Sequence, residues 1–228
     1  MFSKNKSVII RRIICYLAGM FFIASGVIVS RCSDLGVSPV NSVPAVLSEI
    51  TCADLGVCTT AVFIIYVLVQ LILLGRLFKK ASLLQFISSV VFGWFVSLAE
   101  KVLVFIPECT NYIMRLVYVI ISMFLIAFGL MLYLNSELIP MPAEGVTLAL
   151  VQKTGIKLPA AKIIFDWSQV IIAAALSMIF LGELVGVREG TVIAALGVGL
   201  CLKLVSRFLC RYVEKFLCKE KINTAMEK

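Results

Sequence analysis

The chain has 228 residues, of which 61% are hydrophobic and 15% are charged, and its mean hydropathy is +1.08. Since soluble domains hold about 45–50% apolar and about 25% charged residues, this composition excludes an ordinary soluble domain and predicts a multi-pass membrane protein. The net charge of +8 does not indicate a nucleic-acid partner, because the basic residues flank apolar runs, as membrane orientation requires.

Six apolar runs are predicted to cross the hydrocarbon core, which takes a helix of about 20 residues, and the sixth is short unless it begins at Arg188. They are predicted at Ile10–Ser30, Val57–Leu74, Leu83–Val104, Leu116–Leu134, Ala160–Leu181 and Thr191–Val205. The first run follows a basic start, but it is longer than the core of a signal peptide and is interpreted as a retained helix. The fold class is therefore all-α, a polytopic membrane protein.

Two further segments, 39–50 and 142–153, have helical character and open with a proline. They are too short to cross a bilayer and fit a re-entrant or interfacial helix. Each follows a polar stretch that interrupts the apolar pattern, "RCSDLGVSPVN" in the first case and "NSELIPMPAEG" in the second. A broken backbone at membrane depth is tolerated only where protein or water satisfies its polar groups.

The positive charges predict the orientation of these six spans. With residues 1–9 in the cytoplasm, only four of the 21 Lys and Arg residues lie on the outer side, namely Arg31, Lys101, Arg115 and Arg188. The tail, 206–228, repeats apolar residues at helical spacing with basic residues between them. It is predicted to be an amphipathic helix on anionic lipids of the inner leaflet, or alternatively a partner-binding helix.

An internal repeat appears when the sequence is shifted by 103 residues. Met20–Thr51 then aligns without a gap on Met123–Thr154, with 11 identities in 32 pairs. The chain accordingly divides into repeat 1 at 10–104, a connecting loop at 105–115 and repeat 2 at 116–205. Because each repeat holds three spans and one short helix, the second must enter the membrane from the opposite side, which is the inverted-topology arrangement of many secondary transporters.

The two polar stretches hold the candidate substrate-binding residues, because inverted repeats bring such breaks together near the midplane. Helix N-termini there would favour an anion, whereas the acids would favour a cation or a proton. The sequence leaves both signs open, as well as the alternative that the two acids next to the short helices only cap them. The candidates are Asp34, Ser38, Asn41, Glu137 and Glu144.

Charged residues in the last two spans are candidates for coupling or gating, because charges within spans are costly. Lys162 and Asp166 are spaced i,i+4, so Asp166 either forms an intrahelical ion pair or couples transport to a cation. Arg188 and Glu189 precede the sixth span. There Glu189 either complements the helix dipole or takes part in gating, and Arg188 either pairs with it or attracts an anion.

Eight cysteines without a CxxC motif and the absence of histidine exclude a zinc site of the mixed Cys/His type. No metal site or cofactor is expected. The chain also lacks the paired carboxylates, nucleophile and phosphate loop of common catalytic sites, so we expect no enzymatic activity. A disulfide is left open among four cysteines that would share the outer side, Cys32, Cys52, Cys58 and Cys109.

Two motifs together, "SDLGVSP" after the first span and "GVREGTVIAALGVG" (Gly186–Gly199) at the last, resemble the YczE-like branch of the YczE/YyaS/YitT family. The resemblance covers most of Tyr16–Val205. It implies a polytopic protein of the bacterial cytoplasmic membrane, but it supplies no biochemical activity that could be transferred to this chain. From the repeat we predict a secondary transporter or permease for a small solute. The alternative is a non-transporting membrane factor, such as a binding subunit or assembly partner, and a homo-oligomer is open in either case.

Overall fold

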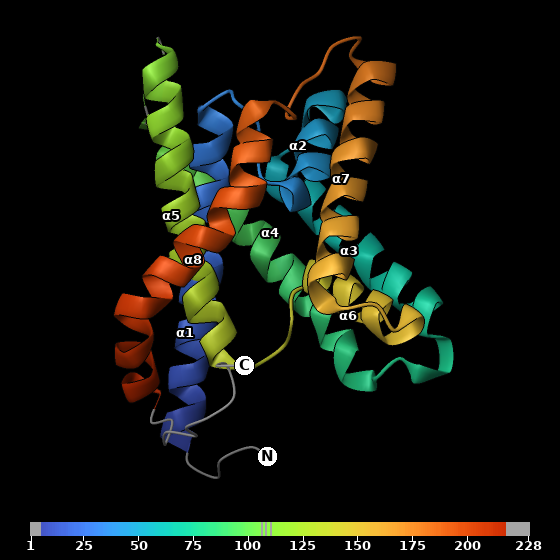
Figure 1. The fold of residues 1–228 in the computed structure, drawn as a ribbon, viewed down its shortest axis with the longest axis vertical. Coiled ribbons are helices and arrows are strands. Elements are labelled where there is room, and N and C mark those ends of the chain that lie inside the picture. Colours follow the sequence, from blue (N-terminus) through green and yellow to red (C-terminus); the bar gives the residue numbers. More distant parts are fainter. Residues whose placement is uncertain (1–5, 106, 108, 110, 218–228) are drawn as a thin grey trace.

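A computed structural model of the chain describes residues 6–105, 107, 109 and 111–217. In this part of the chain every regular element is helical (Figure 1), which confirms the predicted all-α fold. Short 3₁₀ turns at Gly75–Leu77, Lys80–Leu83 and Leu103–Phe105 lie next to the α-helices. The eight α-helices are α1 (Lys6–Cys32), α2 (Pro39–Thr51), α3 (Leu55–Leu74), α4 (Leu84–Val102), α5 (Tyr112–Ser136), α6 (Pro142–Thr154), α7 (Leu158–Phe180) and α8 (Glu189–Phe216).

Six of these helices, α1, α3, α4, α5, α7 and α8, are long and apolar enough to cross a membrane. They are the six predicted spans, and their ends differ from the prediction by a few residues in every helix except α8. The two short helices predicted at 39–50 and 142–153 are α2 and α6, of 13 residues each. At 1.5 Å per residue neither is long enough to cross the hydrocarbon core.

The last helix, α8, continues without a break to Phe216 rather than ending at Val205. The described part of the predicted tail is therefore the end of α8, and residues 218–228 lie outside the described residues. Arg11 of α1 donates a hydrogen bond to the carbonyl of Phe216 at 3.1 Å, and its guanidinium lies 5.5 Å from the Phe216 ring centroid. The end of α8 thus packs on the start of α1.

Helices α1 and α5 pack extensively against each other and run antiparallel (Figure 1). Their backbones touch at glycines, because a Cβ atom added at Gly19 would lie 2.8 Å from the Gly129 carbonyl oxygen. A Cβ atom at Gly129 would in turn lie 2.6 Å from the Gly19 carbonyl oxygen. Small residues at a crossing let two membrane helices approach closely enough for extensive van der Waals contact.

The local backbone structure recurs after the same 103 residues that relate the two halves of the sequence. Helices α2 and α6 begin and end at matching positions, and so do the starts of α3 and α7. Left-handed residues precede the short helices at Asp34 (φ 54°) and Glu137 (φ 50°), and follow them at Cys52 (φ 53°) and Gly155 (φ 75°). Each short helix has proline at its first turn, where the missing N–H is not needed.

The short helices lie in opposite halves of the molecule, α2 in the upper half and α6 in the lower half of Figure 1. Helix α2 packs against α7 and α3, and α6 packs against α3 and α7. Helix α4 packs closely on α3, whereas α8 diverges from α7 and packs on α5 instead (Figure 1). The space between α7 and α8 is where the candidate site lies.

Candidate functional site

A central cavity of about 430 Å³ lies between the N-terminal ends of the two short helices. Helix α2 contributes Ser38 and Asn41, α6 contributes Glu144, and α7 contributes Lys162 and Asp166. Apolar side chains from α1, α3, α4, α5 and α8 form most of the remaining wall. The structure therefore brings together four of the predicted site residues that are far apart in the sequence, namely Ser38, Asn41, Glu144 and Asp166.

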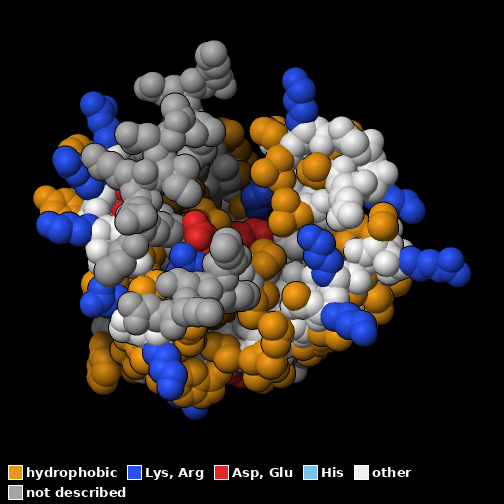
Figure 2. Space-filling view, turned by 90° about the horizontal axis from the view of Figure 1, so that it is seen from below, with side chains coloured by type: hydrophobic (Ala, Val, Ile, Leu, Met, Phe, Trp, Pro, Cys, Tyr) orange, Lys and Arg blue, Asp and Glu red, His pale blue; other side chains and the backbone are white. Residues whose placement is uncertain are grey.

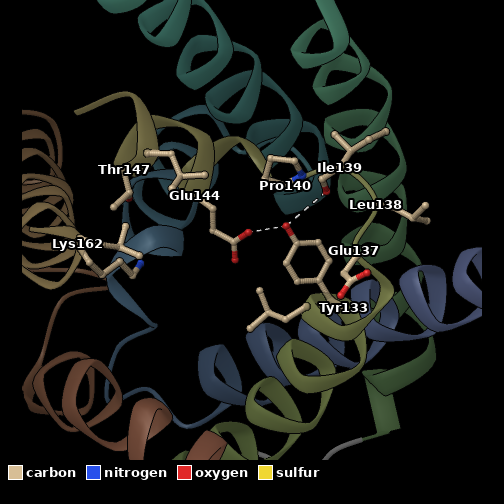
Figure 3. A pocket seen from close by; sticks show the side chains of 11 residues that line it. Tyr133, Glu137, Leu138, Ile139, Pro140, Glu144, Thr147 and Lys162 are labelled. Atoms are coloured by element: carbon tan, nitrogen blue, oxygen red, sulfur yellow. Dashed lines mark hydrogen bonds between the residues drawn. The ribbon is translucent and has the colours of Figure 1, made fainter. Parts of the chain in front are cut away.

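Glu144 stands in the first turn of α6, between Tyr133 of α5 and Lys162 of α7 (Figure 3). Its carboxylate accepts a hydrogen bond from the Tyr133 hydroxyl. That hydroxyl accepts a bond from the backbone N–H of Met141 at 2.5 Å, so it links the carboxylate to the first residue before α6. The Tyr133 ring is held by the Tyr16 ring at a centroid distance of 5.5 Å. The acid is thus oriented by α1 and α5 together.

A second cavity of about 410 Å³ lies beside Glu144 (Figure 3). It shares Leu134, Glu144 and Lys162 with the central cavity, so these residues form the boundary between the two. Glu137 lines this second cavity, and its carboxylate lies 3.3 Å from the Arg12 guanidinium. Figure 2 shows the corresponding lower face, with acidic side chains at its centre and Lys and Arg around its edge.

Asn41 is the least satisfied polar side chain of the central cavity. Its amide nitrogen donates to the Ser38 hydroxyl at 2.9 Å, whereas its side-chain oxygen is buried without a hydrogen-bond partner in the described part of the chain. The residue is only 6% exposed. A buried acceptor without a partner costs about 1–3 kcal/mol. A bound molecule that donates a hydrogen bond to this oxygen would recover that free energy.

Lys162 and Asp166 form the predicted i,i+4 ion pair, with 2.8 Å between the ammonium nitrogen and a carboxylate oxygen. Both side chains also line the central cavity. The sequence left open whether Asp166 forms an intrahelical ion pair or couples transport to a cation. These two roles are compatible, because the ion pair lies on the face of α7 that lines the cavity. The pair cancels the charge of Lys162, which is the one basic side chain among the described residues of the lining.

The remaining predicted residues lie outside the central cavity. Asp34 pairs with Arg115 at 2.7 Å and with Arg188 at 3.2 Å, and Arg188 also donates to the Asp34 carbonyl at 3.0 Å. These contacts tie the segment before α2 to the segment before α8. Glu189 is exposed in the first turn of α8, and Glu137 reaches only the second cavity.

Two sets of contacts involve residues that are related by the 103-residue offset of the repeat. The sequence alone did not predict either set. The ion pairs Arg12–Glu137 and Arg115–Asp34 are exchanged by that shift. Tyr66 and Gln169 are themselves 103 residues apart, and the Tyr66 hydroxyl donates to the Gln169 side-chain oxygen at 2.6 Å. If the repeat alignment is extended beyond Met20, it matches Arg12 with Arg115. Each of these arginines pairs with the acid of the other half, Glu137 for Arg12 and Asp34 for Arg115.

Gln70 is the other buried amide that positions the site. It donates to the Gln85 side-chain oxygen at 2.8 Å and to the Pro142 carbonyl at 3.1 Å. The second bond fixes the start of α6 against α3. The four cysteines considered for a disulfide, Cys32, Cys52, Cys58 and Cys109, are all free thiols.

The comparisons with known proteins give a family and no activity. A family described as a family of unknown function (DUF6198) matches residues 10–207, which include all six predicted spans. No curated protein and no solved structure matches the chain. Neither comparison assigns a chemistry to the central cavity.

Proposed function

This chain belongs to DUF6198, a family of unknown function, and we propose that it is a secondary transporter or permease that carries a small solute through the central cavity. The observation that carries the proposal is that the broken segments before α2 and α6 converge on one cavity that holds buried, unsatisfied or charged side chains. Irregular backbone at membrane depth is tolerated where it lines such a cavity, and transporters place their substrate sites there.

An inverted repeat is part of this proposal. The antiparallel α1–α5 crossing supports it, because Gly26 faces Ile126 while Gly129 faces Ile23, and the 103-residue shift exchanges these two contacts. The exchanged ion pairs described above support it in the same way. Two halves related by an axis in the membrane plane can exchange conformations, which is the structural basis of alternating access.

The two ends of the cavity differ, as alternating access requires. On the Asp34 side, the N–H of Val37 donates to the Gly186 carbonyl at 3.2 Å and the N–H of Gly190 donates to the Leu35 carbonyl at 2.8 Å, which joins the segments before α2 and α8. On the Glu137 side, the second cavity continues from Glu144. With the N-terminus in the cytoplasm, as the basic residues predict, this arrangement is open toward the inside.

The test is whether both faces of the membrane reach the central cavity. In a variant without the eight native cysteines, Val40→Cys places one thiol in the lining. A membrane-impermeant maleimide is then applied to right-side-out and inside-out vesicles. We expect Val40→Cys to be labelled from both faces, because access alternates. Thr51→Cys, at the exposed end of α2, is the matched control and should react from one face only.

Labelling of Val40→Cys from a single face would contradict transport and favour the alternative, a non-transporting membrane factor that uses the same cavity as a static binding site. The location in a bacterial cytoplasmic membrane, the kinship with the YczE-like branch and the absence of catalysis belong to the same proposal. So do the anionic lipids at the end of α8 and a homo-oligomeric assembly.

A further inference from the structure

We propose that the ligand of the central cavity is an amphiphilic organic cation, that is, an apolar body carrying a protonated amine. This inference deepens the proposed function and rests on it for the role of the cavity. It answers the question of ligand charge that the sequence left open. Three features of the described residues carry it: the polar groups of the lining, its apolar wall and a side opening toward the lipid.

The polar groups of the lining favour a positively charged donor. The carboxylates of Glu144 and Asp166 face one ammonium, that of Lys162, which is already paired with Asp166. The unpartnered atom is the side-chain oxygen of Asn41, which is an acceptor. A protonated amine supplies both the N–H donor that this oxygen lacks and the positive charge that the second carboxylate lacks.

The helix dipoles do not reverse this preference. At the start of α6 the acidic side chain of Glu144 already complements the partial positive charge of the helix end. The equivalent position in α2, after the 103-residue shift, is the neutral Asn41. The start of α2 therefore contributes about half an elementary charge, against the full charge of a carboxylate. The two helix ends together offset about one elementary charge, so they balance the negative charge of the lining side chains without reversing it, and the free acceptor of Asn41 still favours a donor.

The rest of the wall suits an apolar body. The rings of Phe63 and Phe92 stack at a centroid distance of 5.3 Å at one side of the cavity, and Ile126 and Leu130 of α5 and Val198 of α8 add aliphatic surface. Small-molecule sites have volumes of about 300–1,000 Å³, so the cavity of about 430 Å³ has room for a single aromatic ring with a short chain.

A third cavity of about 130 Å³ opens sideways between α7 and α8. It shares Pro39, Asp166 and Ala195 with the central cavity. At its outer side lie Trp167, 58% exposed, and Leu196, 72% exposed, on the apolar surface that faces lipid in a six-span protein. An amphiphile that partitions into the bilayer reaches Asp166 through this opening without crossing the aqueous phase.

The experiment compares three probes that share one body and differ in the head group: 2-phenylethylamine, 3-phenylpropionate and 2-phenylethanol. Equilibrium dialysis with the full chain in lipid nanodiscs measures the binding of each radiolabelled probe. We expect saturable binding of the amine, about tenfold or more tighter than that of the carboxylate or the alcohol, because only the amine forms charge-assisted hydrogen bonds.

Two variants of the lining and one matched control test the named residues. Glu144→Gln and Asp166→Asn should each weaken amine binding about tenfold or more, since each removes one charged partner. Glu183→Gln removes an exposed carboxylate of the α7–α8 loop and should leave the affinity unchanged. The thermal unfolding of each variant checks that it is folded. Where Asp166→Asn fails to fold, Asp166→Glu replaces it and is expected to retain binding.

Equal binding of the amine and the carboxylate, or full affinity in both lining variants, would overturn the inference. If none of the probes binds while Val40→Cys is labelled from both faces, the cation hypothesis fails and the transporter proposal stands. If the amine binds as expected while Val40→Cys is labelled from one face only, the cation site stands and transport fails.

Discussion

At the scale of single residues, the site is defined by Asn41 and Glu144, which occupy equivalent positions in the two halves of the chain. One is a neutral amide with a free buried oxygen and the other is an acid bonded to Tyr133. Positions 103 residues apart thus carry an asymmetric pair of polar groups. In the proposed site, this asymmetry would place the head of a ligand between the two groups and its body against the apolar wall.

The pH dependence of amine binding follows from Glu144, which lies on α6 rather than on one of the six spans. Burial raises the pKa of this carboxyl, and the Tyr133 hydrogen bond and the charge of Lys162 partly oppose the rise. Tyr16 and Asp166 are the other titratable groups near it. Below the raised pKa the acid is neutral, so amine affinity should increase as pH rises through that value, while the amine stays protonated.

Dialysis of 2-phenylethylamine across a pH series measures this dependence, and Glu144→Gln should flatten it. An unchanged profile in that variant would assign the titration to another group. The same shift has a consequence for stability. Because the folded state raises the pKa of Glu144, its contribution to stability is present at low pH and is lost as pH rises through the folded-state pKa.

At the scale of helices, the fold depends on the close α1–α5 crossing and on the sparse packing between α7 and α8. The α1–α5 crossing positions both short helices, since α2 follows directly after α1 and α6 directly after α5. The sparse packing between α7 and α8 leaves room for the third cavity at the side of the central one. Glycine is required at the crossing because backbone atoms of the partner helix occupy the space of a side chain.

Gly129→Ala tests the crossing. Its Cβ atom would lie 2.6 Å from the Gly19 carbonyl oxygen, so the two backbones must separate, and we expect a loss of about 1–3 kcal/mol in the free energy of unfolding. Gly199→Ala is the control, since a Cβ atom there meets nothing within 4 Å and should stabilise α8 by up to about 1 kcal/mol. Denaturant unfolding followed by circular dichroism measures both, and equal stability of the two variants would refute the packing role of Gly129.

At the scale of the whole molecule, two ion pairs at opposite ends relate the halves to each other. Asp34 pairs with Arg115 and Arg188 at one end, and Glu137 pairs with Arg12 at the other. The Asp34 end also has backbone hydrogen bonds between the segment before α2 and the start of α8. Under the proposed alternating access, these contacts would hold the Asp34 end closed.

Asp34→Asn should therefore favour the conformation that is open on the opposite side. Since exposed ion pairs are worth about 0.2–1 kcal/mol each, we expect labelling of Val40→Cys from the outer face to become about two- to tenfold faster. Glu49→Gln is the matched control, because its pair with Arg31 joins α1 to α2 and leaves the segment before α8 untouched. If the two variants label equally, the Asp34 contacts do not control access.

The sequence by itself determined the class of the protein, the six spans and both short helices. These features depend on local properties: the length of an apolar run, a proline at a first turn and the distribution of basic residues. The sequence also identified Asn41, Glu144 and Asp166 as candidates, because polar groups inside apolar segments are conspicuous. It also paired Lys162 with Asp166 through their spacing.

Only the tertiary structure decided which of these residues meet. Whether Asp34 faces the cavity or an arginine depends on how α5 and α8 pack, and their positions relative to α2 are not encoded in any local pattern. The role of Tyr133 was invisible for the same reason, since a tyrosine near the end of a span is ordinary until the start of α6 folds back onto it. Long-range packing selects among locally equivalent polar side chains, and that selection defines the site.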